Sequence, residues 1–470
     1  MTPAMRGAEP RDASAAPTAA LAAFAAGIEH RRLPAETAET AKRLLLDGIG
    51  CLLHGTQGDP GRIAWQAVQR FGYGAGPSTA VISGEKISPR DAAFVNGITL
   101  YSVGVNDIHK SSLSHPGGCI VPTLLAVGEW QNSPGADIIA AMAAGYDIMG
   151  RLGRATIPGH WDRGFHPTGT FGPFGATAAA GRLLGLDRSQ MTNALGIAGS
   201  QSSGLKAFQS DGSLTMVFHA GRSAQNGVEA AVLAQEGFTG PGAVLEDRQG
   251  FILTTGGGNT AALTEGLGDT YEIDATTFRP YYGCTLTITA SGAAAEIMKR
   301  RAGRSAADVT GITVRCHPQV IEDVGNADPR TLLGARLSIQ FNIALVLRHG
   351  DVVIGDIGER ELWDPEIRRL LPLVEFQSDA SVENWGCYLD VRFKDGSRER
   401  AAMIYPKGDP ENPMTWDDTV KKFLGMAAPL DRPQQAMKVV EIVRHLEHHR
   451  GAALVAAIAA TARRSGPAPV

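Results

Sequence analysis

Apolar residues recur at helical spacing over about half of this 470-residue chain, from about Thr18 to Ala261. Clear examples are residues 37–53, 91–104 and 137–152, the last of which is preceded by Ser133 and Pro134 as a start signal. Residues 172–186 and 221–237 are rich in alanine and glycine, whose small side chains permit close contact between helices. We therefore expect a compact bundle of helices rather than isolated surface helices.

The pattern changes after Asp274. Residues 312–316 alternate as a strand does, residues 336–347 favour a helix, and residues 387–404 read as a hairpin that turns at Asp395-Gly396. Helical spacing returns in 416–426 and 437–464, after a break rich in proline and glycine at 407–413. The sequence predicts a mainly α fold, with a disordered tail (1–17), a large all-helical domain (18–274 plus 412–470) and an inserted, smaller α+β lid domain (275–411).

Charge and cysteine usage narrow the class of protein. The formal net charge is −4, with 44 Lys and Arg against 48 Asp and Glu, so the chain has no basic field for nucleic acid or anionic membranes. Its five cysteines are scattered without CxxC spacing, which favours neither a disulfide framework nor a zinc site. No apolar run approaches the roughly 20 residues of a membrane span, and residues 1–17 lack the apolar core of a signal peptide. We expect a cytoplasmic protein.

Two segments gather titratable residues beside glycine and proline. Residues 164–175 place His166 in a Gly-rich stretch, predicted as a loop, ahead of the Ala-rich segment 176–186. Upstream, Asn106-Asp107-Ile108-His109 and Ser114-His115-Pro116-Gly117-Gly118 form another punctuated loop between apolar segments. Glycine lets backbone approach a ligand closely, and the free N–H groups at a helix start favour anions. The two segments together predict a small-molecule active site.

Several motifs resemble the MmgE/PrpD family and follow one another in family order. They are 44–50 (LLLDGIG), 114–117 (SHPG), 164–172 (GFHPTGTFG), 211–213 (DGS), 219–222 (HAGR), 235–240 (QEGFTG) and 405–410 (YPKGDP). The resemblance implies a helical domain with an α+β lid, a site between them and a homodimer. It also implies cofactor-free chemistry on small polycarboxylates, as in 2-methylcitrate dehydratases, cis-aconitate decarboxylases and iminodisuccinate epimerases.

The family's site residues are only partly retained. Its two histidines match His115 and His166, and of an Asp-aromatic-Asp-Asp run only Asp107 remains, since the chain reads Gly104-Val105-Asn106-Asp107. Where members carry a lysine the chain has Met216, and where a later histidine is expected it has Ile288. These departures mark a divergent member.

The retained residues suit chemistry at a carbon next to a carboxylate, which needs a base of near-neutral pKa and cations where negative charge builds. His115 and His166 are the candidate base and acid, with Asp107 orienting a histidine or sharing its proton. Candidate substrate-binding residues are Arg279, Lys206 in place of the lost cation, Tyr281 and His219. No metal or cofactor is expected.

Structural alternatives stand beside these roles. A buried histidine is commonly a hydrogen-bonded structural group, Asp107 is equally suited to a turn or cap, and His219 to leading into the helix 221–237. We expect His109 to face solvent, as we do His445, His448 and His449 on the final helix.

The leading hypothesis is a lyase that removes water or carbon dioxide from a small polycarboxylate. The alternatives are an epimerase or isomerase that uses the same proton abstraction, and a catalytically degenerate member that only binds a carboxylate metabolite.

Overall fold

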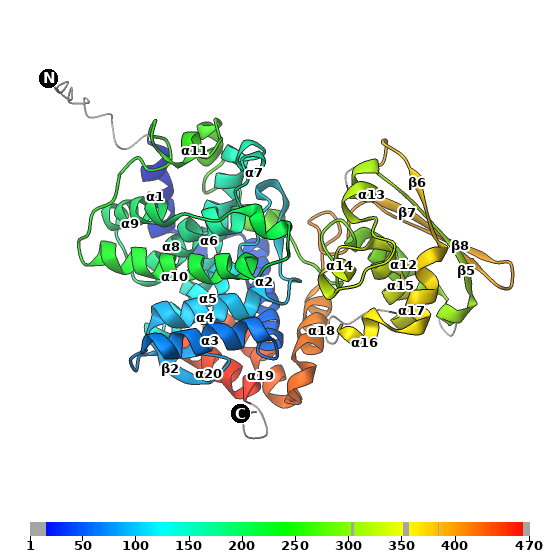
Figure 1. Ribbon diagram of the computed structural model, residues 1–470. Helices are drawn as coiled ribbons and strands as arrows, with labels where there is room; N and C mark the ends of the chain where they lie inside the picture. The colour runs from blue at the N-terminus through cyan, green and yellow to red at the C-terminus, as the bar shows by residue number, and fades with distance from the viewer. Residues whose placement is uncertain (1–15, 302–304, 351–356, 384, 464–470) are drawn as a thin grey trace.

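The computed structural model describes residues 16–301, 305–350, 357–383 and 385–463. Figure 1 shows two lobes side by side. We call them the helical lobe (residues 17–278 and 414–463) and the α+β lobe (residues 288–403). Separate clusters of buried apolar side chains support them, one drawn from residues 21–278 together with 414–462 and the other from residues 290–401. The predicted mainly α fold is confirmed, and the predicted disordered tail lies outside the described residues except for Ala16 and Pro17.

The helical lobe is built from helices of both ends of the chain. They are α1 (Pro17–Gly27), α2 (Ala35–Gly55), α3 (Asp59–Phe71), α4 (Pro89–Tyr101), α5 (Gly117–Trp130), α6 (Gly135–Thr156), α7 (Gly159–Asp162), α8 (Pro167–Leu183), α9 (Arg188–Gln201), α10 (Thr215–Gln235), α11 (Phe251–Thr254), α18 (Trp416–Ala427), α19 (Pro433–Arg444) and α20 (Gly451–Ala462). The C-terminal helices α18 to α20 return to this lobe after the chain has passed through the other one (Figure 1). A small hairpin of β1 (Ser78–Ala80) and β2 (Glu85–Ile87) lies beside α4.

Local sequence explains where these helices begin and how closely they pack. Ser88 starts α4 by accepting the N–H of Asp91 at 3.1 Å, and Asp187 starts α9 in a capping box with Gln190. At the crossing of α4 and α10, a Cβ on Gly97 would lie 2.7 Å from the Cα of Gly221. The alanine and glycine content predicted such contact, because only residues this small let two helix backbones approach so closely.

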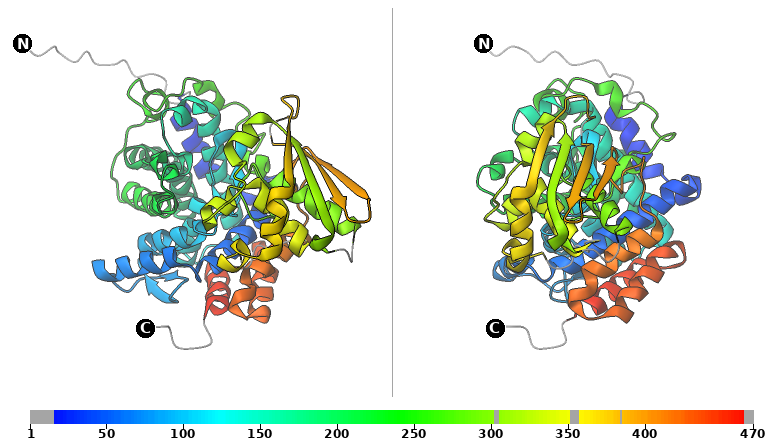
Figure 2. Two further views of the ribbon diagram at one scale, coloured as in Figure 1. Left: turned by 45° about the vertical axis from the view of Figure 1, so that its right-hand side comes forward. Right: turned by 90° about the vertical axis from the view of Figure 1, so that its right-hand side faces the viewer.

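The α+β lobe carries one four-stranded sheet in the order β6-β5-β7-β8. Its elements are α12 (Ile288–Arg300), β5 (Val309–Cys316), α13 (Pro318–Val324), α14 (Leu332–Arg336), α15 (Ile339–His349), α16 (Glu359–Leu362), α17 (Pro365–Leu370), β6 (Val374–Ser378), β7 (Cys387–Phe393) and β8 (Arg398–Met403). Strand β5 runs parallel to β6 and antiparallel to β7, which forms the predicted hairpin with β8. The right-hand view of Figure 2 looks onto the sheet, with the helical lobe behind it.

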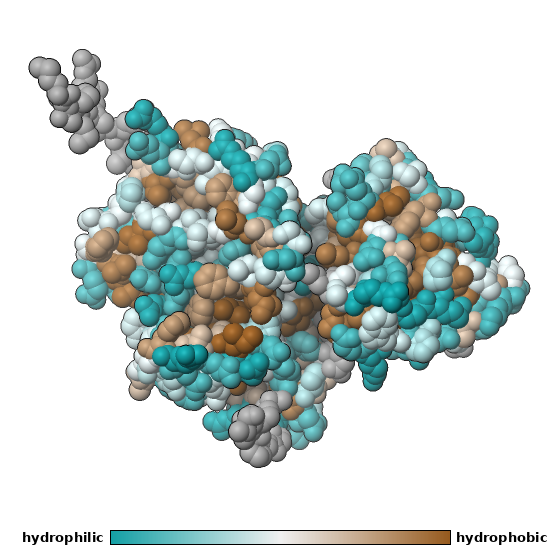
Figure 3. Space-filling model, in the orientation of Figure 1, coloured by the Kyte–Doolittle hydropathy of each residue, from teal (hydrophilic) through white to brown (hydrophobic). Residues whose placement is uncertain are grey.

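Alternation along the strands gives the sheet one buried face. Leu389 and Val391 are buried between the exposed Tyr388 and Arg392, as a half-buried strand requires. Helices α12 and α15 pack against each other, and α12 also packs on β7 and β8. In Figure 3 polar and apolar residues are interspersed on both lobes, and the outline of the molecule narrows where the lobes meet.

One predicted helix begins later in the structure and another is broken. Of the helix expected at 336–347, residues 339–347 lie in α15, which starts where Ser338 accepts the N–H of Phe341 at 3.1 Å, and Arg336 ends the separate helix α14. The helix expected at 437–464 ends at Arg444 and resumes at Gly451, so His445, His448 and His449 lie in the connecting segment rather than on a helical face. His445 and His448 are exposed, as expected.

The two connections between the lobes lie beside the predicted active-site segment. Strand β4 (Thr276–Thr277), where the chain leaves the helical lobe, pairs with β3 (Ile108–His109). The returning segment joins the same place, since the N–H of Phe278 donates to the carbonyl of Gly408 at 2.9 Å. Thr277 Oγ1 also donates to Asp409 Oδ1 at 2.6 Å. The segment that ends in Asp107 therefore lies at the junction of the lobes, while the exact domain boundaries stay a prediction.

Candidate active site

Both predicted catalytic histidines stand at the start of a helix, each followed by proline. Pro116 directly precedes α5, and His166 directly precedes α8, whose first residue is Pro167. A residue before proline is held in extended backbone, as His166 is at φ −97° and ψ 109°, and proline suits the first position of a helix. The His-Pro pairs thus fix both imidazoles at helix N-termini by local chain stiffness.

The Gly-rich stretch after His166 is helical, and its prediction as a loop is wrong. It forms the first half of α8, where its glycines face neighbouring chain. A Cβ on Gly169 would lie 2.7 Å from the carbonyl oxygen of Ser203, and one on Gly172 would lie 2.6 Å from the Cβ of Ser223. Packing therefore overrides the low helix propensity of glycine here.

The structure brings the surroundings of the two histidines together. The backbone N–H of His115 donates to Thr168 Oγ1 at 3.1 Å, and Thr168 lies two residues beyond His166. The ring of Tyr101 packs edge-on against His115 with 5.5 Å between centroids, and its hydroxyl lies 3.4 Å from Thr168 Oγ1. His115 is partly exposed, whereas His166 is only 5% exposed.

The contacts of His115 define which of its nitrogens is basic. Nδ1 lies 2.6 Å from the backbone carbonyl oxygen of Asp107, which can only accept, so Nδ1 carries the proton and the lone pair is on Nε2. Burial and the nearby Arg279 guanidinium hold the pKa of His115 well below its usual 6.5. The imidazole is therefore neutral at pH 7 and presents Nε2 as a proton acceptor.

His166 and His219 form a hydrogen-bonded pair. Their Nδ1 atoms lie 2.9 Å apart, so one ring donates and the other accepts. Burial, and then the neighbouring His219, lower the pKa of His166 to about 3. The prediction that His219 merely leads into a helix is wrong, because α10 already begins at Thr215 and His219 lies within it.

Asp107 links the start of α5 to the junction of the lobes. Its Oδ2 accepts the N–H of Gly117 at 3.1 Å and the hydroxyl of Tyr146 at 3.0 Å, and its Oδ1 accepts from Asn106 Nδ2 at 3.3 Å. Burial raises its pKa to about 6 in spite of these bonds. The carboxyl of Asp107 thus supports the first turn of α5, as the capping alternative predicted. The backbone carbonyl of the same residue orients His115.

The four carbonyls of residues 104–107 each accept from a basic side chain. Three donors come from distant parts of the chain: Arg336 Nη2 to Gly104 (2.5 Å), Lys422 Nζ to Val105 (2.8 Å) and Arg279 Nε to Asn106 (2.5 Å). The fourth is His115, which donates to Asp107 as described above. Lys422 also pairs with the buried Asp47 at 2.5 Å. Three cations therefore converge on a segment in which the family's acidic run is reduced to one carboxyl.

Arg279, a predicted substrate-binding residue, lies beside Asn106 in the candidate site. It is 3% exposed, and within the described chain no carboxylate lies within ion-pair distance of its guanidinium. Burial and the charge of Arg336 lower its pKa to about 10, so it stays protonated at neutral pH. A buried guanidinium without a carboxylate in direct contact is costly, and this one is suited to a carboxylate ligand.

The remaining predicted residues lie nearby but with other partners. The ammonium of Lys206 sits 3.7 Å from the ring centroid of Trp161, a cation–π contact. Tyr281 is half-buried, and its Cε2 would be 3.5 Å from a Cβ on Gly292 in α12. Met216 packs with an apolar cluster that includes Tyr101, and Ile288 is buried at the start of α12. The substrate-binding roles of Lys206, Tyr281 and His219 stay predictions.

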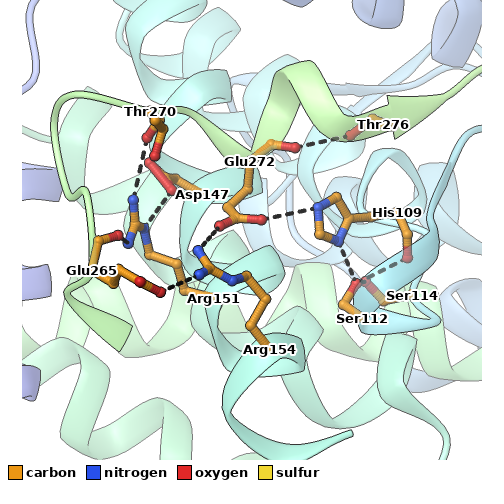
Figure 4. A network of polar contacts seen from close by, with 10 residues as sticks. All are labelled: His109, Ser112, Ser114, Asp147, Arg151, Arg154, Glu265, Thr270, Glu272 and Thr276. Atoms are coloured by element: carbon orange, nitrogen blue, oxygen red, sulfur yellow. Dashed lines mark hydrogen bonds and ion pairs between the residues drawn. The ribbon is translucent and has the colours of Figure 1, made fainter. Parts of the chain in front are cut away.

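His109 does not face solvent, and that prediction is wrong. It is 1% exposed, and in Figure 4 its ring lies between Glu272 and Ser112. Nε2 is 3.2 Å from Glu272 Oε2, and Nδ1 is 2.9 Å from Ser112 Oγ. Arg154 reaches the other Glu272 oxygen at 2.9 Å. Pairing of β3 with β4 turns His109 inward, which its local sequence did not signal.

Several site residues carried no sequence signal of their own. Tyr101 and Tyr146 sit inside helical segments, Lys422 lies on an ordinary amphipathic helix, and Arg336 is one of many arginines. Thr168 belongs to the motif that contains His166, and Asp47 to the first family motif. The repeated pattern His-Pro-x-Gly-x-x-x-Pro at 115–122 and 166–173 is a signal that would have paired the two helix starts.

Among the described residues, no three His, Cys, Asp or Glu side chains form a group that would hold a metal ion. Within the same residues, none of the helices combines the length and the apolar character needed to cross a membrane.

Comparison with known proteins gives matches over most of the chain. The MmgE/PrpD N-terminal domain matches residues 19–264, and the MmgE/PrpD C-terminal domain matches residues 281–448. Human cis-aconitate decarboxylase is 26% identical over 90% of this chain and 90% of its own length. A cis-aconitate decarboxylase-like protein of Aspergillus oryzae is 27% identical over 92% and 94%, and 2-methylcitrate dehydratase of Cupriavidus necator is 25% identical over 71% of each chain.

Proposed function

Because this chain belongs to the MmgE/PrpD family, we propose that it is a lyase that removes carbon dioxide or water from a small polycarboxylate without a cofactor. The names of its relatives, cis-aconitate decarboxylase and 2-methylcitrate dehydratase, support lyase chemistry on such acids. The observation that carries the proposal is one juxtaposition. A neutral histidine with a free Nε2 and a buried guanidinium without a carboxylate partner are held by adjacent residues, Asp107 and Asn106.

This juxtaposition matches what the reaction requires. Loss of carbon dioxide leaves negative charge on a carbon that must then take up a proton, and loss of water begins with removal of a proton next to a carboxylate. In loss of water, His115 Nε2 takes the proton from the carbon, and the hydroxyl group leaves as water after His166 donates a proton to it. In loss of carbon dioxide no proton is removed first, so the carbanion takes up a proton from His166, which regains one from solvent. Arg279 binds the carboxylate next to the reacting carbon and stabilises the negative charge as it builds.

His166 and Asp107 complete the proposed proton path. His166 is the second proton-transfer group, and its bond to His219 fixes the ring and supplies a route for the proton. Asp107, with a pKa of about 6, orients His115 through its backbone carbonyl and sets the local charge through its side chain. Lys206 and Tyr281 are proposed to contact other parts of the substrate.

The proposal is tested with a panel of acids in deuterated water. The purified protein is incubated with cis-aconitate, 2-methylcitrate, citrate and iminodisuccinate, and products are followed by proton NMR. We expect loss of carbon dioxide or water from at least one of the first three. Deuterium uptake without net loss would instead indicate an epimerase, and binding without any exchange a degenerate member.

Variants connect the activity to the site. His115→Asn should abolish most turnover, whereas His448→Asn, a change in the exposed segment between α19 and α20, should not. Equal activity of both variants would show that His115 is not the base.

We also propose that the protein is a cytoplasmic homodimer, as the family resemblance implies. Leu205, Leu214 and Phe218 are large apolar side chains that are 60%, 52% and 44% exposed; Leu205 lies in the connection between α9 and α10, Leu214 directly precedes α10, and Phe218 lies in its first turn. An exposed group of this kind is suited to a protein interface. Light scattering after size-exclusion chromatography measures the mass, and a monomer at micromolar concentration would contradict this proposal.

A further inference from the structure

Arg336 reaches the candidate active site from the other lobe. It is the last residue of α14, and its Nη2 donates to the carbonyl of Gly104 at 2.5 Å, across 232 residues of sequence. This is the only side-chain hydrogen bond that its guanidinium makes with the described residues. A guanidinium carries five N–H donors, so most of its capacity is unused there.

The backbone at Gly104 makes room for this side chain. Gly104 has φ +71°, a left-handed conformation that disfavours other residues, and a Cβ at this position would coincide with the guanidinium of Arg336. In the family's acidic run this is the position of the first acid. Arg336 can therefore approach only because this position carries glycine instead of the acid.

The charges around Arg336 are unbalanced. Among the described residues no carboxylate lies within ion-pair distance of Arg336 or of Arg279, although Arg336 donates to Gly104 and Arg279 to Asn106 in the same segment. Arg279 is almost fully buried. Each arginine also disfavours protonation of His115, as like charges near one another do. Within the described residues Asp107 interacts with Arg279 at longer range, but neither arginine has a carboxylate in direct contact, so each can take one from a ligand.

We propose that Arg336 is a substrate-binding residue, and that Arg279 and Arg336 bind two carboxylates of the same substrate. The inference rests on the proposed function and adds to it a second residue that binds the substrate. Arg279 binds the carboxylate next to the reacting carbon, and Arg336 binds a second carboxylate. The pair selects substrates with at least two carboxylates and places part of the specificity on the α+β lobe.

The test separates binding from turnover. Tricarballylate is a saturated tricarboxylate without a hydroxyl group, so it cannot lose water, and its terminal and central monoamides each lack one charge. Calorimetric titration gives Kd for all three ligands with the wild type, Arg336→Gln and Arg336→Lys. Arg330→Gln is the matched control, because Arg330 is an arginine of the same lobe that pairs with Asp328 on the surface.

We expect Arg336→Gln to weaken tricarballylate binding at least tenfold and Arg336→Lys to weaken it less. For one of the two monoamides, the Kd values of the wild type and Arg336→Gln should agree within about twofold. This monoamide already lacks the carboxylate charge that Arg336 would bind. Arg330→Gln should bind all three ligands as the wild type does. Melting temperatures of the variants show that they are folded, and Arg336→Lys keeps the charge if the glutamine variant is unstable.

Equal weakening of all three ligands by Arg336→Gln, or no weakening, would overturn the proposal. So would a wild type that does not bind tricarballylate. Turnover of the acid panel is measured separately. If binding depends on Arg336 but no acid is turned over, the proposed function is refuted and the role of Arg336 stands. If an acid is turned over but Arg336→Gln binds the ligands as the wild type does, the proposed function stands and the role of Arg336 is refuted.

Discussion

The raised pKa of Asp107 gives a prediction about stability that does not depend on the proposed function. The carboxyl is 2% exposed, and burial raises its pKa from the usual 3.8 to about 6. At about 1.36 kcal/mol per pKa unit, the folded state prefers the protonated form by roughly 3 kcal/mol relative to the unfolded chain. The stabilisation from this group is fully present below pH 3.8 and is lost as the pH rises through about 6.

Asp107→Asn removes this titration. The amide keeps an oxygen for Gly117 and Tyr146 but places an NH₂ group toward Asn106 Nδ2, which adds a cost that does not change with pH. Hence the difference in the free energy of unfolding between the variant and the wild type should depend on pH. We expect the wild type to lose roughly 1.5 kcal/mol relative to the variant between pH 5 and pH 8.

Urea unfolding followed by circular dichroism at pH 5, 6, 7 and 8 measures this difference. Asp59→Asn, a change of an exposed carboxyl at the start of α3, controls for the substitution itself. A difference between Asp107→Asn and the wild type that stays constant over this range would refute the reasoning, because it would mean that burial does not shift the ionisation of Asp107.

Three further predictions concern the same region. His115→Asn keeps a donor toward the Asp107 carbonyl but lacks Nε2, so we expect kcat to fall about 10²- to 10⁴-fold with little change in melting temperature, and a fall below tenfold would contradict the assignment. Arg279→Gln should raise KM for the polycarboxylate and lower kcat, with partial recovery in Arg279→Lys; steady-state kinetics that match the wild type would exclude it from the site. Lys422→Met leaves Asp47 buried and unpaired, so urea unfolding should show a loss of roughly 3–5 kcal/mol, and much of it should return when Asp47 is also replaced by leucine.

Local pattern was a good guide to elements and a poor guide to contacts. The predicted strand at 312–316, the hairpin and the helix at 416–426 are confirmed, since each depends on residues close together in sequence. The Gly-rich stretch after His166 was predicted as a loop because glycine is a poor helix former alone, and helix packing reversed that preference. His109 was predicted at the surface because nothing near it in sequence shows that Glu272 lies opposite.

The sequence by itself determined the mainly α fold, membership of the MmgE/PrpD family and the two stiff His-Pro pairs. These follow from periodicity, motif order and the stiffness of the His-Pro bond, all of which are local. Only the tertiary structure decided that Arg336, Lys422 and Arg279 meet the four residues from Gly104 to Asp107. Their partners lie 232, 317 and 173 residues away along the chain, and such distances are closed by the packing of whole lobes rather than by any local preference.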